Sequence, residues 1–118
     1  MMAKRRASRE PEEYLPLAPA TFHILLALAD GELHGYAIMK AVGGGLGPGT
    51  LYTALKRLLE AGLVAESSAR VDPERGDERR RYYRLTPFGV SVARAEAQRL
   101  EAIVRAARHK KLIGARPA

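Results

Sequence analysis

The spacing of hydrophobic residues predicts that the chain is mainly helical. A first helix is expected in PATFHILLALAD (residues 19–30), because Pro19 suits a first helical position and the DG pair at its end suits a stop. Its apolar positions form one stripe with more apolar surface beside it: Phe22, Leu25, Leu26 and Ala29, then Ile24 and Leu28. A helix that is apolar around so much of its circumference is either buried or meets another subunit.

A shorter second helix is predicted in HGYAIMKAV (residues 34–42). Its apolar residues share one face, and Tyr36 and Lys40 form an i,i+4 pair on the other. The next segment, GGGLGPG (residues 43–49), is too rich in glycine and proline to hold a helix. We therefore expect a tight connection between the second helix and the third.

The third helix is expected over residues 50–61, and Gly62 stands where a C-terminal cap belongs. One face of this helix is suited to a core, with a helical repeat of leucines: Leu51, Leu55, Leu58 and Leu59. The opposite face is polar and carries Thr50, Tyr52, Thr53, Lys56, Arg57 and Glu60.

Two β-prone segments follow, LVAES (residues 63–67) and RYYRLT (residues 81–86), with a polar stretch over residues 68–80 between them. This pattern predicts a β-hairpin with a long tip. The second and third helices are then a helix-turn-helix pair, and the hairpin is placed as a wing. The predicted fold class is mainly α with a two-stranded β wing, which is a winged helix-turn-helix with a C-terminal dimerisation helix.

A last helix is predicted from Pro87 to about residue 109, with Thr86 as its N-cap. Apolar and small residues recur along it at intervals of 3, 4, 3, 4 and 3 positions: Val90, Ala93, Ala97, Leu100, Val104 and Ala107. This a/d-type seam of about two and a half heptads predicts contact with a partner helix.

The expected organisation has four parts. They are a charged arm over residues 1–13, a winged helix-turn-helix domain over 14–86, a dimerisation helix over 87–110 and a flexible tail over 111–118.

Composition narrows the function classes. The formal net charge is +7, so the expected partner is anionic, with nucleic acid first and an acidic membrane surface second. The chain has no cysteine, which excludes disulfides, thiolate metal sites and cysteine nucleophiles. The longest apolar segment, FHILLALA, is too short to cross a bilayer, and nothing resembles a secretory signal. We expect no membrane association and a cytoplasmic location.

The polar face of the third helix is suited to DNA. In a helix-turn-helix the second helix of the pair enters the major groove, with its N-terminal residues nearest the base edges. Thr50 and Thr53 can contact bases or phosphates, and Lys56 and Arg57 carry the charge that displaces counterions. Tyr52 can donate its hydroxyl to a phosphate. An ordinary amphipathic surface helix is the alternative interpretation.

The expected wing adds arginines. Residues 70–84 contain six arginines and four acids, a net charge of +2, so a solvated loop of mixed charge is a competing interpretation. The acids lie toward the tip, whereas three arginines lead into the returning strand, where they can neutralise phosphates or enter a narrow minor groove. The complete candidate DNA surface is Tyr36, Lys40, Thr50, Tyr52, Thr53, Lys56, Arg57, Arg79, Arg80 and Arg81.

An enzyme is not expected. The three histidines are His23, His34 and His109, and the sequence has no nucleophile–base pairing and no phosphate-binding glycine fingerprint. We predict no catalytic residue, no cofactor and no metal site, and we expect His34 to cap or pack at a helix start. A winged helix that contacts another protein instead of DNA is the remaining alternative.

Three segments carry a resemblance to a known family. FHILLALADGELHGYAIMKAV, GPGTLYTALKRLLEAGLV and RRRYYRLTPFG, in this order, resemble the PadR family of winged-helix transcriptional regulators. The resemblance implies a homodimeric repressor of its own or a neighbouring promoter, with Tyr36, Thr50, Tyr52 and Lys56 near DNA. It also implies a dimer formed by the C-terminal helix with help from the first helix, which adds Phe22 and Leu26 to the expected interface.

Two expectations remain open within this resemblance. Some members respond to a phenolic or drug-like effector, but the resemblance transfers no effector residues, and Tyr14 and Phe22 are only weak aromatic candidates. Relatives also have several more residues between the second helix and GPGTLY. We therefore expect a shortened second helix or a compressed loop in this chain.

Overall fold

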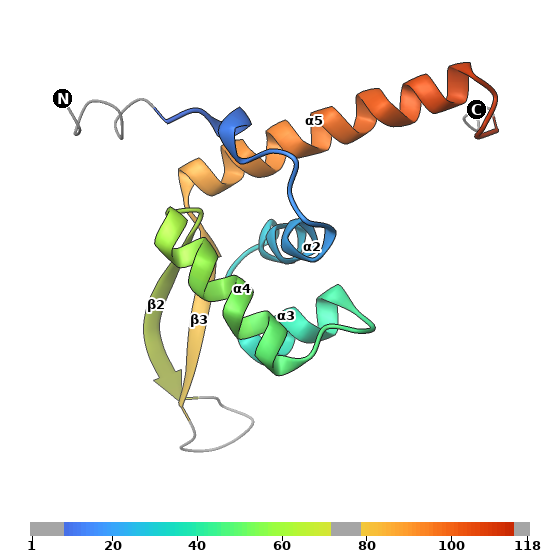
Figure 1. Ribbon diagram of the computed structural model, residues 1–118. Coiled ribbons are helices and arrows are strands. Elements are labelled where there is room, and N and C mark those ends of the chain that lie inside the picture. Colours follow the sequence, from blue (N-terminus) through green and yellow to red (C-terminus); the bar gives the residue numbers. More distant parts are fainter. Residues whose placement is uncertain (1–8, 72–78, 115–118) are drawn as a thin grey trace.

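The computed structural model describes the backbone of residues 9–71 and 79–114, with the side chains of residues 9–67 and 81–114. Figure 1 shows the arrangement of the elements. In chain order they are the 3-10 helix η1 (Pro11–Tyr14), α2 (Pro19–Leu28), β1 (Leu33–His34), α3 (Gly35–Val42), α4 (Pro48–Ala61), β2 (Val64–Val71), β3 (Arg79–Leu85) and α5 (Pro87–His109).

The four expected α-helices are present. Two of them differ from the expected ranges by two residues: α2 ends at Leu28 instead of residue 30. α4 begins at Pro48 instead of residue 50, with Gly47 as its N-cap. Proline is accommodated there because its fixed φ suits a helix and its missing N–H would have no intrahelical partner. The connection between α3 and α4 is therefore residues 43–47 alone, a tight connection as the glycine-rich sequence predicted. Gly62 ends α4 in the left-handed conformation, with φ of 81°.

The sheet has one strand more than predicted. Its order is β1-β3-β2, with antiparallel pairing throughout. The short strand β1 pairs with β3 through Leu33 opposite Tyr83 and His34 opposite Tyr82. The hairpin strands are also longer than expected, because β2 continues to Val71 and β3 starts at Arg79, inside the stretch predicted as loop. Residues 72–78, the expected tip, lie outside the described residues.

The segment before α2 packs against the domain. We expected an arm over residues 1–13, of which residues 1–8 lie outside the described residues. Over residues 9–13 the structure differs from this expectation, because η1 packs on α5 and the Tyr14 ring meets the Phe88 ring edge-on at 5.5 Å. Arg9 explains the order of this segment: its guanidinium lies 4.3 Å from the centroid of the Phe88 ring and donates to the Ala61 carbonyl oxygen at 2.7 Å.

One hydrophobic core joins the helices to the sheet. Its buried side chains come from α2, α3, α4, the turn after α4, the sheet and α5: Ile24, Leu25, Leu28, Ile38, Leu51, Leu55, Leu58, Leu63, Val64, Tyr83 and Val92. The buried face of α2 is thus centred on Ile24, Leu25 and Leu28. The stripe through Phe22 and Leu26 lies to one side of it, and Leu26 is 46% exposed.

The start of α5 is fixed to the end of α4. The Thr86 hydroxyl caps α5 by accepting from the Gly89 N–H at 2.9 Å, and it donates to the Gly62 carbonyl oxygen at 2.6 Å. A side chain at Gly89 would collide with the backbone of Leu63, whose carbonyl carbon lies 2.9 Å from the position of an added Cβ. Glycine is required there because α5 approaches this backbone so closely.

The second half of α5 leaves the domain. Figure 1 shows α5 running past α2 and extending beyond the other elements. Apolar side chains are exposed along this part, including Ile103 at 51% and Val104 at 41%. This length of helix has no packing partner within the described part of the chain.

Candidate nucleic-acid interface

The polar face of α4 is open to solvent. Leu51, Leu55 and Leu58 are buried, so the helix is fixed in rotation and its other face points outward. The exposed side chains on that face are Thr50, Tyr52, Thr53, Lys56 and Arg57. Neither Lys56 nor Arg57 has a hydrogen-bond or ion-pair partner among the residues whose side chains are described. Both charges are therefore free to meet an anion.

Tyr52 has a second role, because its ring lies against the start of α3. A Cβ added to Gly35 would lie 2.9 Å from Cζ of Tyr52 and closer still to its hydroxyl oxygen. The glycine of the HGY segment therefore makes room for the tyrosine of the TLY segment. This contact places the Tyr52 ring against the start of α3, and it was not predicted from the sequence.

Tyr36 and Lys40 form an exposed pair on α3. Tyr36 is 53% exposed, and the Lys40 ammonium lies 5.6 Å from the centroid of its ring. The pair predicted from the i,i+4 spacing is therefore present. His34 begins this helix as expected, since its Nδ1 accepts from the Ala37 N–H at 3.2 Å. Its ring also meets the Tyr82 ring edge-on, which ties the start of α3 to β3.

The wing arginines are in different situations. Arg81 donates to the Glu66 carboxylate at 2.9 Å, and this hydrogen bond raises the pKa of the Arg81 guanidinium. Its side chain is 68% exposed, so the ion pair is screened by water and contributes little to stability. Arg79 and Arg80 begin β3, but their side chains lie outside the described residues. Arg81 is thus the one wing candidate whose side chain is described, and it already has a partner.

The predicted dimer residues divide between the core and the surface. Ala93 packs against the hydrophobic core, whereas Leu26, Val90, Ala97 and Val104 are exposed. Phe22, Leu100 and Ala107 are half-buried. Phe22, Leu26 and Leu100 line a groove of about 330 Å³ between α2 and α5. The structure therefore brings the expected residues of the first and last helices together on one face.

A buried carboxylate next to this groove was missed by sequence reasoning. Glu96 is 2% exposed, accepts from the Leu17 N–H at 3.1 Å, and forms two hydrogen bonds with Arg99 at 2.6 and 2.9 Å. The hydrogen bonds from Arg99, with help from Leu17, lower the pKa of Glu96 although burial acts in the opposite direction. Glu96 follows the buried Val92 by one helical turn. A charged residue at a position expected to face the core was therefore the sequence signal for this buried carboxylate.

Within the described residues, no three His, Asp or Glu side chains come together as a possible metal site. No described helix combines the length and the apolar character needed to span a membrane. His23 and His109 are both exposed.

The pairing of α3 with α4, followed by the antiparallel hairpin of β2 and β3, defines a winged helix-turn-helix protein. Residues 24–95 match the family described as the Transcriptional regulator PadR-like family. The chain belongs to this family of transcriptional regulators, as the three sequence segments predicted.

Two individual relatives are similar to more than half of this chain. The Transcriptional regulator Rv3488 of Mycobacterium tuberculosis (strain ATCC 25618 / H37Rv) is 35% identical over 91 residues, covering 75% of this chain and 81% of that protein. An uncharacterized 37.1 kDa protein in transposon TN4556 of Streptomyces fradiae is 45% identical over 78 residues, covering 63% of this chain. The match spans only 21% of that longer protein.

A solved structure shares the fold. The crystal structure of a PadR family transcription regulator from hypervirulent Clostridium difficile R20291 superposes with a TM-score of 0.69 at 27% identity. The match covers 78% of this chain and 97% of that one. The two chains therefore share their fold over most of the length of this chain.

Proposed function

We propose that this regulator is a homodimer that binds a pseudo-palindromic operator and represses its own promoter or a neighbouring one. One observation supports this most strongly: the outward face of α4 combines hydroxyl groups with two cations that have no protein partner among the described residues. α4 is the helix that enters the major groove in a helix-turn-helix. It is called the recognition helix below.

Each residue of this surface has a distinct task in the proposal. Thr50 and Thr53, near the start of the recognition helix, contact base edges or phosphates. Lys56 and Arg57 neutralise phosphates and release counterions. Tyr52, held in place by Gly35, donates its hydroxyl to the DNA backbone. Further phosphate contacts come from Tyr36 and Lys40 on α3 and from Arg79, Arg80 and Arg81 on the wing.

The protruding half of α5 supports the homodimer. Its exposed apolar residues, including Ile103 and Val104, continue from the groove lined by Phe22, Leu26 and Leu100. A second copy of the chain would cover both surfaces at once. In such a dimer we expect the two recognition helices to lie about 34 Å apart, one turn of DNA, and the two-fold symmetry then calls for a pseudo-palindromic operator.

The experiment is a binding titration of the full chain on its own upstream region. Fluorescence anisotropy at several salt concentrations gives the slope of log affinity against log salt. We expect a steep slope, and we expect Lys56→Ala to reduce its magnitude by about one, the loss of one phosphate contact. Lys110→Ala removes the same charge from the far end of α5 and serves as the matched control, with no expected change.

The alternative, a winged helix that binds another protein, predicts a different outcome. Binding to the upstream region would then be weak and no tighter than binding to a shuffled duplex, and Lys56→Ala would leave the protein partner bound. Repression itself is tested with a reporter gene behind the same region. Expression should rise when the regulator is deleted, whereas a fall would indicate an activator.

A further inference from the structure

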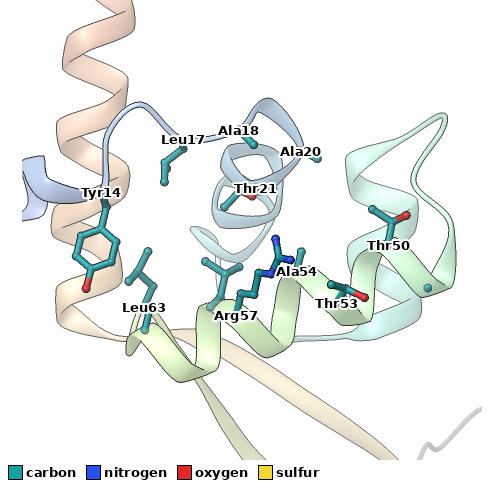
Figure 2. A pocket seen from close by; sticks show the side chains of 13 residues that line it. Tyr14, Leu17, Ala18, Ala20, Thr21, Thr50, Thr53, Ala54, Arg57 and Leu63 are labelled. Atoms are coloured by element: carbon teal, nitrogen blue, oxygen red, sulfur yellow. The ribbon is translucent and has the colours of Figure 1, made fainter.

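The segment that precedes α2 (residues 9–17) connects the recognition helix with α5. Figure 2 shows it running from beside α5 to the start of α2, with Tyr14 and Leu17 along it. At its first residue, Arg9 donates to the carbonyl oxygen of Ala61 at 2.7 Å. Ala61 is the last residue of the recognition helix, so its carbonyl oxygen belongs to the negative end of the helix dipole and has no partner within the helix. The Arg9 guanidinium therefore holds the helix at this end.

The same segment is fixed to α5 at two places. Near the start of α5, the Arg9 guanidinium lies 4.3 Å from the centroid of the Phe88 ring. Farther along α5, the buried carboxylate of Glu96 accepts from the Leu17 N–H at 3.1 Å. Two hydrogen bonds from Arg99 fix the orientation of this carboxylate. The position of α5 is therefore passed through the segment to the end of the recognition helix.

The recognition helix has open space along one side. A cavity of about 690 Å³ lies between it and the first half of α2, and the cavity extends from Gly49 to Ala61 (Figure 2). Atoms that line a void lose the packing contacts they would otherwise make. The direction of the helix then depends more on the contacts at its two ends. These are Tyr52 against Gly35 near its start and Arg9 on Ala61 at its last residue.

We propose that Arg9 is a positioning residue for operator binding, and that it sets the half-site spacing that the dimer accepts. Arg9 itself does not contact DNA in this role. It acts through Ala61, because it holds the end of the recognition helix at a fixed place relative to α5. The inference rests on the proposed function, in which α5 forms the dimer contact and the recognition helix contacts the operator.

A fixed direction of the recognition helix makes the half-site spacing matter. One additional base pair moves the half-sites about 3.4 Å farther apart and rotates one relative to the other by about 35°. A recognition helix that is held at both ends cannot follow this displacement, so one half-site loses base contacts. A helix released at its last residue can pivot about the contact between Tyr52 and Gly35. Removing Arg9 should therefore broaden the accepted spacings instead of abolishing binding.

The test is a set of anisotropy titrations on duplexes from the chain's own upstream region, after a footprint has located the half-sites. The spacer between the half-sites is shortened or lengthened by one or two base pairs, and a further duplex carries a single half-site. The wild-type chain should prefer the natural spacing over its neighbours by about tenfold or more, the value of one base contact. In Arg9→Ala this preference should fall to about threefold or less, half of that free energy. Affinity for the single half-site should stay within about twofold of wild type.

Two further variants separate positioning from the loss of a charge. Arg94→Ala removes the same charge from an exposed position on α5 and should retain the wild-type spacing preference. Tyr14→Phe removes the hydroxyl that accepts from Arg9 and keeps the ring that packs on Phe88. It should broaden the preference less than Arg9→Ala, and it should add nothing in the Arg9→Ala background. Additional broadening in that background would assign the effect to Tyr14 and overturn the proposal.

Hydrogen exchange on the chain without DNA gives an independent readout. The N–H groups of Gly62 and Leu63 donate to carbonyls in the last turn of the recognition helix. They should exchange about tenfold faster in Arg9→Ala, because this end of the helix opens more often. Unchanged exchange would show that Arg9 does not hold the helix end and would also overturn the proposal. Urea unfolding confirms that each variant is folded.

The results separate this inference from the proposed function. A wild-type chain that binds none of the upstream duplexes refutes the proposed function, and the positioning role falls with it. A spacing preference that Arg9→Ala retains refutes the positioning role alone. The same conclusion follows if the wild-type chain binds all spacings equally, or if Arg9→Ala weakens every duplex to the same extent, the single half-site included.

Discussion

Replacing Gly35 by Ala tests whether α3 holds Tyr52 in position for DNA. The added Cβ would lie 2.9 Å from Cζ of Tyr52 and 3.2 Å from its Cε1, and closer still to the hydroxyl oxygen. The Tyr52 ring has to move. Because Tyr52 is 49% exposed, the ring can turn into solvent without displacing the backbone of the recognition helix. The substitution therefore changes a side-chain position more than it changes the fold.

The expected magnitudes follow from this geometry. Alanine favours a helix over glycine by about 1 kcal/mol, and overpacking costs about 1–3 kcal/mol. The cost is at the lower end here, because the displaced ring is half-exposed. The two effects nearly cancel, so the free energy of unfolding should change by about 1 kcal/mol or less. A hydrogen bond to a charged group contributes about 1.5–3 kcal/mol, so losing the proposed contact of Tyr52 with a phosphate should lower DNA affinity about tenfold or more.

The assays are urea unfolding and anisotropy titration on the same preparation. Gly44→Ala is the matched control, because an added Cβ there meets nothing within 4 Å. The decisive comparison is Gly35→Ala in a Tyr52→Ala background, where the substitution should no longer affect DNA binding. If Gly35→Ala weakened binding equally in both backgrounds, Tyr52 would not carry the effect and the reasoning would be wrong.

Four further outcomes are expected. Because the folded-state pKa of Glu96 is below its ordinary value of 4.5, Glu96 stabilises the fold above pH 4.5, and this stabilisation is lost as pH falls through the lowered pKa. Glu96→Gln should therefore lower the free energy of unfolding in urea at neutral pH and make it depend less on pH in acid. An unchanged dependence on pH in acid would contradict this. Leu100→Glu should sediment as a monomer, whereas its neighbour Gln98→Glu should remain dimeric; a persistent Leu100→Glu dimer would refute the assigned seam. Thr53→Ala should change the order of affinities for operators that differ by one base pair, with a change in affinity of about tenfold at most at one position. An equal loss of affinity for all operators would indicate that Thr53 contacts the DNA backbone instead. Arg9→Ala should lower the free energy of unfolding by about 1–3 kcal/mol, measured in urea, because the Ala61 carbonyl loses its charged donor; no change would show that water replaces it.

The helices could be predicted because their signals are local. The leucine repeat of α4 and the threonine-proline start of α5 both depend on residues within one or two turns. Those predictions are confirmed, with an error of two residues at the start of α4. The exposed pair of Tyr36 and Lys40 could also be predicted, because its i,i+4 spacing is local.

The missed features depend on contacts between distant parts of the chain. Strand β1 exists because Leu33 pairs with Tyr83, fifty positions later (83 − 33), and two residues alone show no alternation. The order of residues 9–13 depends on a hydrogen bond that spans 52 positions, from Arg9 to Ala61. Likewise, the role of Glu96 depends on Leu17, 79 positions earlier. No local pattern contains this information.

These long-range contacts also connect the two functional parts of the protein. The segment before α2 is bound at one end to the recognition helix, through Arg9, and at the other to α5, through Glu96. Thr86 adds a third connection where α5 begins. In the proposed dimer α5 sets the distance between the two subunits. Because these contacts connect α5 to the recognition helix, the same dimer contact also sets the separation of the two recognition helices. A rigid connection of this kind suits an operator with fixed half-site spacing.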